Sequence, residues 1–380
     1  MASFDLIFFD AGGGHRAAAT ALKTVMDERH PELEPHLLHL KDVLEPVDIF
    51  RRVLGVDLQE LYNLMLRRGW TLGSQRGLRV MQRMIRGYHT SEVRLLRRWW
   101  QQHGTPDMAV SLIPNFNRAM FEAWKRAAPG RPYVTILTDI ADFPPRFWIE
   151  RQPQYFICGS TRAAEQARAM GHPPERIFLT SGMILQPHFY NLPPIDRDAE
   201  RLKIGLDPNV TTGLILFGGY GSKTILKIVR RLEPLAGKLQ LIVIAGKNAK
   251  LQQALNELPG SLRRHVVGFT REVPHYMRLA DFFIGKPGPG SLSEAVHMGL
   301  PCITVRNTLT LPQERYNSLW LKENGYGIVL RSFRRIERAV REHILAEDRL
   351  QRMRQQTAAA NNQAIFEIPE ILNEILRRHA

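Results

Sequence analysis

The chain alternates along its whole length between short apolar runs and segments with helical periodicity. Twelve of the runs have the length of a β-strand, and most are apolar at nearly every position, which is typical of strands buried on both faces of a parallel sheet. They form two series. The first comprises residues 4–10, 36–40, 108–113, 133–138, 155–158 and 177–180, and the second comprises residues 213–217, 240–245, 265–267, 282–284, 301–305 and 327–330.

Two such series predict an α/β protein built from two Rossmann-like, doubly wound domains. The length of 380 residues agrees, because it exceeds what one ordinary hydrophobic core organises. Pro187, Pro193 and Pro194 interrupt the periodicity between the two series. We therefore predict a first domain over residues 1–190, a linker over residues 191–203 and a second domain over residues 204–345.

A separate helical segment over residues 346–380 follows the second domain. Its last part has one apolar face that needs a partner, because apolar residues recur there at helical spacing. Pro369 lies in the middle and predicts a kink. The apolar positions are Ile365, Ile368, Leu372 and Ile375.

The first predicted strand runs into a glycine-rich turn. Gly12, Gly13 and Gly14 precede His15, and a run of helix-forming residues follows. Three glycines between a strand and a helix allow another molecule to approach the backbone closely, and the helix dipole favours a neutral histidine base. The alternative is a tight turn with an incidental histidine. Asp139, at the end of another strand, is an alternative base or a loop cap.

The first strand of the second domain also ends in glycines. Gly218 and Gly219 precede a Gly-Ser-Lys-Thr sequence, but Ser222 occupies the position before the lysine that a P-loop fills with glycine. The sequence therefore does not favour an ATPase or a GTPase. We predict a simpler loop that contacts phosphate, with a plain strand-to-helix turn as the alternative.

The most specific segment covers residues 285–301, where a strand runs into a glycine-proline loop and a helix begins near Ser291. The free N–H groups of such a helix and the Ser291 hydroxyl suit a diphosphate. Glu294 lies one turn further on, where its carboxylate can accept hydrogen bonds from a ribose diol. The alternative is that Ser291 and Glu294 only form a capping box. The amide of Gln313 and the carboxylate of Glu314 suit sugar hydroxyls.

Positive charge is the one unusual bulk property: the formal net charge is +15 and the sequence pI is ≈ 10.1. Such an excess implies an anionic partner. Eleven arginines and three acidic residues lie between Arg51 and Arg98. We predict an anionic phospholipid surface as the partner of this segment. A solvated helix face and nucleic acid are the alternatives, although no nucleic-acid motif accompanies the charge.

This segment contains an arginine stripe at helical spacing, an apolar face opposite it, and tryptophans of the kind that favour a membrane–water interface. The stripe is Arg76, Arg79, Arg83 and Arg86, the apolar face is Leu78, Met81 and Ile85, and the tryptophans are Trp70, Trp99 and Trp100.

Other features exclude several classes of protein. The longest apolar runs are strand-sized, well short of the roughly 20 residues of a membrane helix. Residues 1–10 lack the basic start of a signal peptide and predict a strand. Cys158 and Cys302 are predicted to be buried thiols in a reducing cytoplasm. The triplet Asp196-Arg197-Asp198 has a metal-binding pattern, but its place before a helical run favours N-capping.

Together these motifs resemble the monogalactosyldiacylglycerol synthase type of glycosyltransferase, in family 28 with the GT-B fold. The matching stretches are residues 10–19, 217–221, 245–248, 267–270, 285–301 and 312–317. They follow the order of the family over nearly the whole chain. The processive diacylglycerol glucosyltransferases and the peptidoglycan lipid-intermediate N-acetylglucosaminyltransferase are more distant. The resemblance implies two domains that face a central cleft, with a C-terminal helix that crosses back to the first domain.

The resemblance also implies an inverting transfer of galactose or glucose from a UDP-sugar to diacylglycerol, without a metal or another cofactor. By this resemblance His15 is the acceptor-side histidine, Glu294 binds the ribose, and Phe269 lies where the uracil is held. Gln313 and Glu314 match the pair that binds the donor sugar. The other positions that the resemblance places in the site are Gly13, Gly14, Gly218, Gly219, Lys247, Asn248, Gly290, Ser291, Leu292 and Asn317.

We expect a cytoplasmic enzyme that binds peripherally to the inner face of the cell membrane through its first domain. Two departures from the family leave the acceptor and the sugar open. Plant synthases carry a histidine shortly after the pair matched by Thr138 and Asp139, where this chain has residues 141–145, and Pro312 replaces a glycine. The alternatives are transfer to another lipid acceptor, a nucleotide-sugar 2-epimerase, and a non-catalytic anionic-lipid-binding protein.

Overall fold

The computed structural model describes residues 1–10, 14–44, 75–308 and 310–379, with the backbone alone for residues 75–86 and 88. The chain divides into two compact units. The first contains Met1–Pro187, Leu311–Gln313 and Asn362–Ala380, and the second contains His188–Thr310 and Glu314–Asn361.

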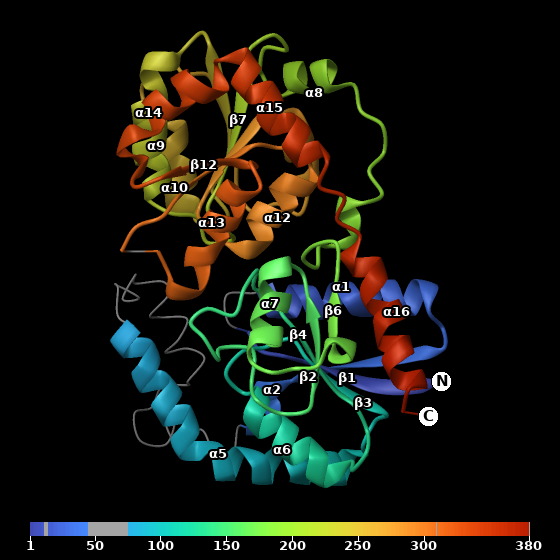
Figure 1. Cartoon of the computed structure of the whole chain (residues 1–380). Helices are drawn as coiled ribbons and strands as arrows, with labels where there is room; N and C mark the ends of the chain where they lie inside the picture. The colour runs from blue at the N-terminus through green and yellow to red at the C-terminus, as the bar shows by residue number, and fades with distance from the viewer. Residues whose placement is uncertain (11–13, 45–74, 309, 380) are drawn as a thin grey trace. The chain divides into compact units, whose positions relative to one another are not determined.

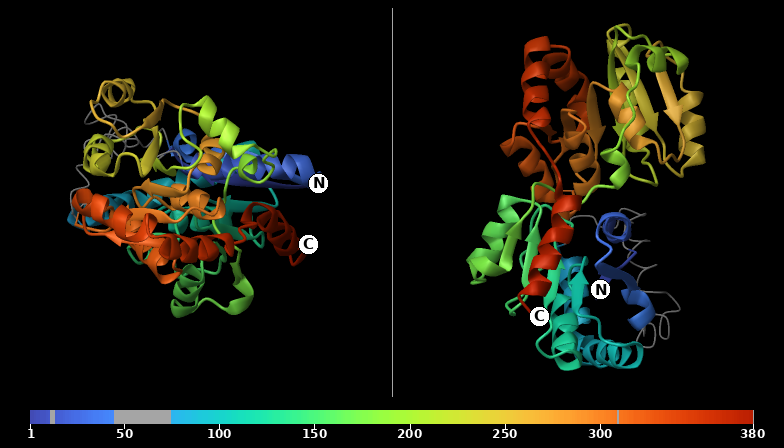
Figure 2. Two further views of the ribbon diagram at one scale, coloured as in Figure 1. Left: turned by 90° about the horizontal axis from the view of Figure 1, so that it is seen from above. Right: turned by 90° about the vertical axis from the view of Figure 1, so that its right-hand side faces the viewer.

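The first unit is built on a six-stranded parallel sheet with helices around it (Figures 1 and 2). Its strand order is β2-β1-β3-β4-β5-β6. The strands are β1 (Ala2–Phe8), β2 (Leu33–His39), β3 (Met108–Ser111), β4 (Tyr133–Ile136), β5 (Tyr155–Cys158) and β6 (Ile177–Leu179). The helices are α1 (Gly14–Arg29), α2 (Leu40–Leu44), α5 (Gln75–His103), α6 (Asn117–Ala127), α7 (Thr161–Ala169) and α16 (Ala364–Arg377).

The second unit repeats this plan with the strand order β12-β11-β10-β7-β8-β9, again all parallel. The strands are β7 (Thr211–Leu216), β8 (Leu239–Ile244), β9 (Arg264–Val267), β10 (Phe282–Gly285), β11 (Cys302–Val305) and β12 (Gly327–Leu330). The helices are α8 (Arg197–Lys203), α9 (Thr224–Leu232), α10 (Ala249–Asn256), α11 (Val273–Leu279), α12 (Pro289–His297), α13 (Arg315–Glu323), α14 (Ile336–Ala339) and α15 (Glu347–Ala358).

Each of the twelve predicted strands is present, so the prediction of two doubly wound α/β units is confirmed. Each sheet has one point at which the strand order reverses, between β1 and β3 in the first unit and between β7 and β10 in the second. Open α/β sheets bind ligands beyond the carboxyl ends of the strands at such points. Gly14 and His15 begin the helix that follows β1, and the loop over residues 286–288 follows β10. Both segments therefore lie at the two switch points.

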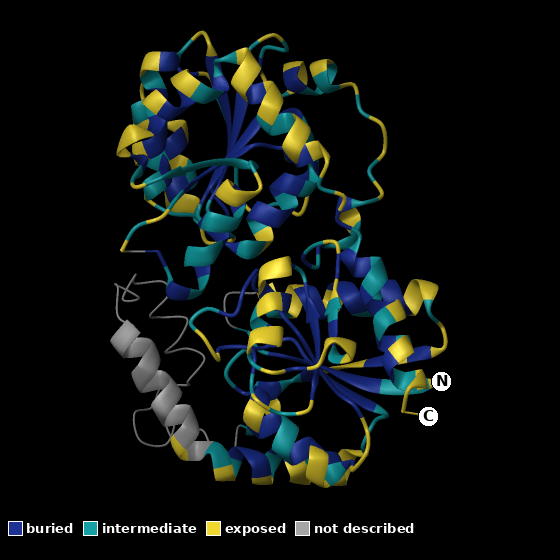
Figure 3. Cartoon of the chain, viewed as in Figure 1, coloured by how far each residue is buried: buried dark blue, intermediate teal, exposed yellow. Residues whose placement is uncertain are grey.

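The strands form the buried centre of each unit, and the helices expose their outer residues (Figure 3). In the second unit one face of the sheet shares a core with α9, α10 and α14, to which Ile225, Leu251 and Ile336 contribute. The other face shares a core with α12 and α13, to which Leu292 and Leu321 contribute.

The last helix, α16, packs on α1 within the first unit, and the two chain ends lie side by side there (Figures 1 and 2). The helix continues through Pro369. The predicted apolar face is confirmed, because its four positions are all buried: Ile365, Ile368, Leu372 and Ile375. Before the helix, Asn362 donates a hydrogen bond from Nδ2 to the carbonyl oxygen of Met183, at 2.9 Å.

Helix α15 belongs to the second unit, whose core includes Leu350. The chain therefore changes unit between Asn361 and Asn362, later than the predicted boundary at residue 346. The reason is that the apolar residues of α15 already have partners in the second core, whereas those of α16 pack in the first unit.

One tryptophan predicted to enter a membrane is a core residue. Trp100 is 1% exposed, its Nε1 donates to Asp5 Oδ2 at 2.8 Å, and its ring meets the edge of Trp124. The prediction is therefore wrong for Trp100. Trp99 is partly buried and stacks on His103. Trp70 lies outside the described residues, as do the side chains of the arginine stripe and of the apolar face opposite it: Arg76, Arg79, Arg83, Arg86, Leu78, Met81 and Ile85.

Both cysteines are buried free thiols, as predicted. Among the described residues, no helix is long and apolar enough to span a membrane.

Candidate functional site

His15 is the second residue of α1, directly beyond the carboxyl end of β1. Its Nδ1 lies 2.9 Å from Thr138 Oγ1, which follows β4. Gly14 begins the helix, and a Cβ there would have no atom within 4 Å. Gly13 lies outside the described residues. Among the described residues, the space beside Gly14 in the first turn of α1 is therefore free of neighbouring atoms. The same turn places the imidazole of His15 beside Thr138, just after β4.

Burial lowers the pKa of His15 to about 4, with a hydrogen bond to the Leu112 backbone acting in the opposite direction. Burial has this effect because it disfavours the charged imidazolium. His15 is therefore neutral at pH 7, and a neutral imidazole can accept a proton.

Trp148 connects the two candidate bases. Its indole Nε1 donates to Asp139 Oδ2 at 2.9 Å, and its ring centroid lies 5.9 Å from that of His15. Both Trp148 and Asp139 are buried. The structure thus brings His15 and Asp139 together around Trp148, a residue that no sequence motif indicated.

Asp142 holds the loop that carries Trp148. Its carboxylate accepts hydrogen bonds from the backbone N–H groups of Arg146, Phe147 and Trp148, at 2.8, 2.8 and 2.7 Å. Burial raises the pKa of Asp142, and these backbone hydrogen bonds, that of Trp148 first, act against the rise. Gln166 on α7 bonds to both backbone polar groups of Asp142. The loop over residues 142–148 is therefore braced by the carboxylate of its own first residue.

In the second unit, the glycine turn after β7 packs against the turn after β8. Gly218, Gly221 and Gly246 have φ angles of +77°, +61° and +64°, which favour glycine. The backbone N–H of Lys247 donates to the carbonyl oxygen of Gly219 at 2.8 Å. A Cβ on Gly246 would lie 2.5 Å from the same oxygen. Backbone contacts therefore hold the two turns together.

Lys247 and Phe269 form an exposed pair. The Nζ of Lys247 lies 4.9 Å from the ring centroid of Phe269, which is 56% exposed. An exposed ring beside a cation offers a planar face for stacking. Asn248 serves the neighbouring helix instead, because its Oδ1 accepts from the Leu251 N–H at 3.0 Å and so caps α10.

The N-terminus of α12 has no side-chain cap in the described part of the chain, and its N-cap residue is Gly288. The alternative of a capping box is therefore wrong, because the helix begins before Ser291. The N–H groups of Gly290 and Ser291 belong to the first turn, where helical N–H groups lack an intrahelical acceptor. A Cβ on Gly290 would have no atom within 4 Å. Leu292, in contrast, is fully buried in the core.

Two carboxylates belong to this region. Burial raises the pKa of Glu294, on α12, to about 7. Glu314 is buried, and its Oε1 pairs with Lys286 Nζ at 3.3 Å. A Cβ on Gly288 would lie 3.5 Å from Ser291 Oγ and 3.8 Å from Glu314 Oε1. The structure therefore brings Glu314 to the glycine loop that precedes α12.

Asn317 is fully buried, and its Nδ2 donates to the carbonyl oxygen of Pro287 at 2.8 Å. Its Oδ1 is buried without a hydrogen-bond partner among the described residues. Asn317 therefore holds the loop that leads into α12. Gln313 is partly buried in the 3₁₀ turn η5 (Pro312–Glu314), where the chain passes from one unit to the other.

The aspartate triplet caps a helix, as predicted. Asp196 Oδ1 accepts from the N–H groups of Asp198 and Ala199, at 3.1 and 3.0 Å, at the start of α8. Within the described ranges, no group of three His, Cys, Asp or Glu side chains could hold a metal ion.

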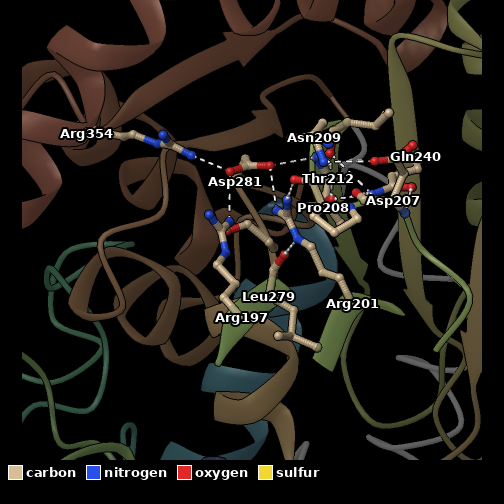
Figure 4. A network of polar contacts seen from close by, with 12 residues as sticks. Arg197, Arg201, Asp207, Pro208, Asn209, Thr212, Gln240, Leu279, Asp281 and Arg354 are labelled. Atoms are coloured by element: carbon tan, nitrogen blue, oxygen red, sulfur yellow. Dashed lines mark hydrogen bonds and ion pairs between the residues drawn. The ribbon is translucent and has the colours of Figure 1, made fainter. Parts of the chain in front are cut away.

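The middle residue of the triplet joins a buried ion cluster (Figure 4). Arg197 and Arg201 from α8 and Arg354 from α15 all donate to Asp281, which precedes β10. Burial raises the pKa of Asp281, but Arg197 and Arg201 more than offset the rise, so the pKa lies below its ordinary value. The first and last helices of the second unit along the chain, α8 and α15, therefore both bind the carboxylate of Asp281.

Comparison with known proteins gives a family match over most of the second unit and most of α16. Residues 214–375 match the glycosyltransferase family 28 C-terminal domain. Monogalactosyldiacylglycerol synthase 1 of Arabidopsis thaliana is 26% identical over 391 residues, which cover 98% of this chain and 71% of that protein. The processive diacylglycerol beta-glucosyltransferase of Bacillus subtilis (strain 168) is 26% identical over 255 residues, which cover 66% of this chain and 63% of that protein.

Solved structures share the fold at low sequence identity. MurG of Acinetobacter baumannii matches with a TM-score of 0.62 and 12% identity, over 98% of this chain and 99% of that one. A UDP-N-acetylglucosamine 2-epimerase matches with a TM-score of 0.59 and 12% identity, over 98% and 95%. Anabaena HepE in complex with UDP-glucose matches with a TM-score of 0.55 and 14% identity, over the whole of both chains.

The predicted GT-B class of α/β fold is confirmed by these neighbours and by the two parallel sheets. The protein carries the C-terminal domain of glycosyltransferase family 28 and is homologous to the monogalactosyldiacylglycerol synthases.

Proposed function

We propose that the protein transfers galactose or glucose, with inversion, from a UDP-sugar to diacylglycerol and so forms a glycosyldiacylglycerol at a membrane surface. The names of its homologues from Arabidopsis and Bacillus support diacylglycerol as the acceptor. The complex of HepE with UDP-glucose supports a UDP-sugar as the donor for this fold.

One observation carries the proposal: the uncapped N-terminus of α12, at the switch point of a family 28 domain, with a carboxylate one turn further on. A diphosphate there would receive hydrogen bonds from the N–H groups of Gly290 and Ser291 and the favourable end of the helix dipole. Glu294 would accept hydrogen bonds from the ribose, and Glu314 from the sugar. The ring of Phe269 would lie against the uracil.

In the proposed reaction, a base of the first unit removes the proton of the acceptor hydroxyl as its oxygen attacks the anomeric carbon. The bond from that carbon to UDP breaks, and the N-terminus of α12 stabilises the charge that develops on UDP. His15 is the proposed base because it is neutral and lies at the switch point of its sheet. Asp139 is the alternative.

No metal ion takes part in this scheme, because the helix N-terminus supplies the positive potential that the leaving group needs. Transfer that continues in excess EDTA is the expected result. Transfer that stops in EDTA and returns with magnesium or manganese would refute the metal-free scheme.

The proposed membrane contact of the first unit is the segment between Arg51 and Arg98. At its described end, Arg94, Arg97 and Arg98 are exposed on α5. None of these three has a carboxylate within 4 Å among the residues that the structure describes. We propose that they contribute to peripheral binding at the cytoplasmic face of the cell membrane.

The experiment is incubation with each UDP-sugar and dispersed diacylglycerol, followed by identification of the lipid product and its anomeric configuration. We expect a β-linked glycosyldiacylglycerol, and none from the His15→Ala variant on the same time scale. The epimerase neighbour, with a TM-score of 0.59, gives a second candidate function. An epimerised UDP-sugar formed without any lipid would favour that function and overturn the transferase proposal.

A further inference from the structure

The second unit has a larger net positive charge than the first, because it contains fewer acidic residues. Its residues include 26 lysines and arginines and 15 acidic residues, whereas the first unit has 26 and 22. The arginine-rich segment between Arg51 and Arg98 therefore accounts for only part of the net charge. Apart from Lys247 and Lys286, the cations of the second unit were not assigned to the donor site described above, so we ask where they lie on the surface.

Helix α9 places a row of cations on its outer side. Lys223, Lys227 and Arg230 are exposed, at spacings of four and three residues that put them on one side of a helix. The opposite side, with Ile225 and Ile228, is buried in the core.

A second row lies on the neighbouring segment. The 3₁₀ turn η6 (Phe333–Arg335) and α14 both pack against α9 and bury Phe333 and Ile336 in the same core. Arg331, Arg334 and Arg335 are exposed there. The two rows thus belong to adjacent elements that cover one face of the sheet. We call these six residues the α9–α14 basic face: Lys223, Lys227, Arg230, Arg331, Arg334 and Arg335.

Carboxylates do not neutralise this face. Among the described residues, none of its six cations has a carboxylate within 4 Å. The acidic groups on the same elements are engaged elsewhere. Glu337 pairs with Arg341, Glu342 pairs with Arg338, and Glu233 accepts from the N–H of Leu262. The face therefore keeps its full positive potential.

An exposed aromatic residue lies at the start of α9. Tyr220, in the turn between β7 and this helix, is 57% exposed. Tyrosine favours the boundary between water and lipid head groups, because its ring is apolar and its hydroxyl is polar. A row of cations with an aromatic residue at its end suits a phospholipid surface better than a purely ionic partner.

We propose that the α9–α14 basic face binds an anionic phospholipid surface, as a second membrane contact in addition to the segment between Arg51 and Arg98. Cations attract phosphate-bearing head groups, and each additional cation near the surface adds to the attraction. This inference rests on the proposed function, because an enzyme needs a membrane contact if its acceptor is a lipid. Its test, however, measures vesicle binding and does not depend on catalysis. Nucleic acid, the other polyanion, is the outcome that would overturn it.

The test compares two double variants of the full chain. Lys227→Glu with Arg334→Glu changes one residue in each row of the face. Arg263→Glu with Lys322→Glu is the matched control, because both residues are exposed, belong to the same unit and alter the net charge equally. The probe is sedimentation with vesicles of phosphatidylglycerol and phosphatidylcholine, at a salt concentration at which the unmodified protein is half bound.

We expect the face variant to lose about 25-fold in vesicle partition, since each cation near an anionic surface contributes roughly fivefold. The control should bind as the unmodified protein does. Equal partition of the two variants would overturn the proposal. So would a loss confined to binding of double-stranded DNA, which would assign the face to nucleic acid.

Glycosyl transfer to detergent-dispersed diacylglycerol separates this inference from the proposed function. The face variant should retain that activity, because the substituted residues lie outside the donor site. If the unmodified protein itself lacked the activity, the proposed function would fail, and the vesicle comparison would still decide the inference.

Discussion

The candidate sites at the two switch points differ in the kind of group that forms them. In the first unit, side chains form the site: His15 meets Thr138, and Trp148 joins His15 to Asp139. In the second unit, the backbone forms the candidate phosphate-binding part of the site, through two glycine turns and the first turn of α12. The side-chain site holds groups that can exchange a proton. The backbone site offers N–H groups that can bind phosphate but cannot change charge.

This difference predicts different sensitivities. Removing a side chain should damage the first site, because the removed atoms are the functional ones. In the phosphate-binding part of the second site the functional atoms belong to the main chain, so the damaging change there is one that adds a side chain and shifts the backbone. Each experiment below tests one side of this contrast.

The largest effect is expected from His15→Ala. We predict that kcat falls by roughly 10²–10⁴-fold, the usual contribution of a general base, while affinity for UDP is unchanged. Steady-state kinetics and calorimetric titration with UDP measure the two effects. Asp139→Asn is the companion variant. If it caused the larger loss of kcat, Asp139 would be the base and His15 a neighbour that positions it.

A methyl group should be enough to damage the backbone site. In Gly246→Ala, the new Cβ would lie 2.5 Å from the carbonyl oxygen of Gly219 and would push the two turns apart. We predict a loss of UDP affinity of roughly ten- to a hundredfold, the scale of losing one hydrogen bond to a charged group. Calorimetric titration with UDP measures it.

Gly237→Ala is the control for backbone strain. Gly237 also has a positive φ, of +83°, but a Cβ there would have no atom within 4 Å. Both variants should lose stability, because alanine is strained at such angles. Only Gly246→Ala should lose affinity. If both variants bound UDP as the unmodified protein does, the packing of the two turns would not shape the donor site.

The sequence was sufficient for the fold and for placing glycine-rich loops at the switch points of the two sheets. Apolar runs of strand length identified each of the twelve strands, and glycines after β1, β7 and β10 marked the loops at the switch points. These signals are local, since each depends on residues within one short stretch. Composition also identified an excess of positive charge, although not the part of it that lies on the second unit.

Contacts between distant residues were not predictable from the sequence. Trp148 reaches the site because Asp142 folds the intervening loop, and only the folded chain shows this. The sequence alone could not distinguish a core position from an interfacial one for Trp100, because an amphipathic tryptophan suits a membrane boundary and a core equally well. In the fold its N–H reaches Asp5, which is 95 positions earlier in the chain. Asn317 belongs to the stretch 312–317 that resembles the family, yet its side chain is buried and bonds to the loop at Pro287.

Trp148 offers a further test of the side-chain site in the first unit, because it contacts that site through one hydrogen bond. Trp148→Phe keeps an aromatic ring beside His15 and removes the N–H that donates to Asp139. Loss of a donor to a carboxylate costs about 1.5–3 kcal/mol, so kcat/KM should fall by at least about tenfold.

Trp124→Phe is the matched control for this change. Trp124 is another buried tryptophan of the first unit, and its Nε1 donates to the carbonyl oxygen of Arg131. Its removal should lower thermal stability and leave kcat/KM unchanged. An equal fall of kcat/KM in both variants would show a general effect of core damage, and Trp148 would have no special role.

The smallest effect concerns the one titratable side chain that we place on the ribose. Burial raises the pKa of Glu294 to about 7, so the carboxyl is mostly protonated at pH 6 and mostly ionised at pH 8. Only the ionised form accepts hydrogen bonds at full strength from both ribose hydroxyls. UDP affinity should therefore rise a few-fold between these pH values.

The phosphates of UDP also gain charge in this range, so Glu294→Gln is titrated alongside to remove that contribution. Calorimetry at both pH values should give a steeper rise for the unmodified protein than for Glu294→Gln. Equal slopes would mean that UDP binding does not depend on an ionised Glu294, and the donor site would then be a backbone site alone.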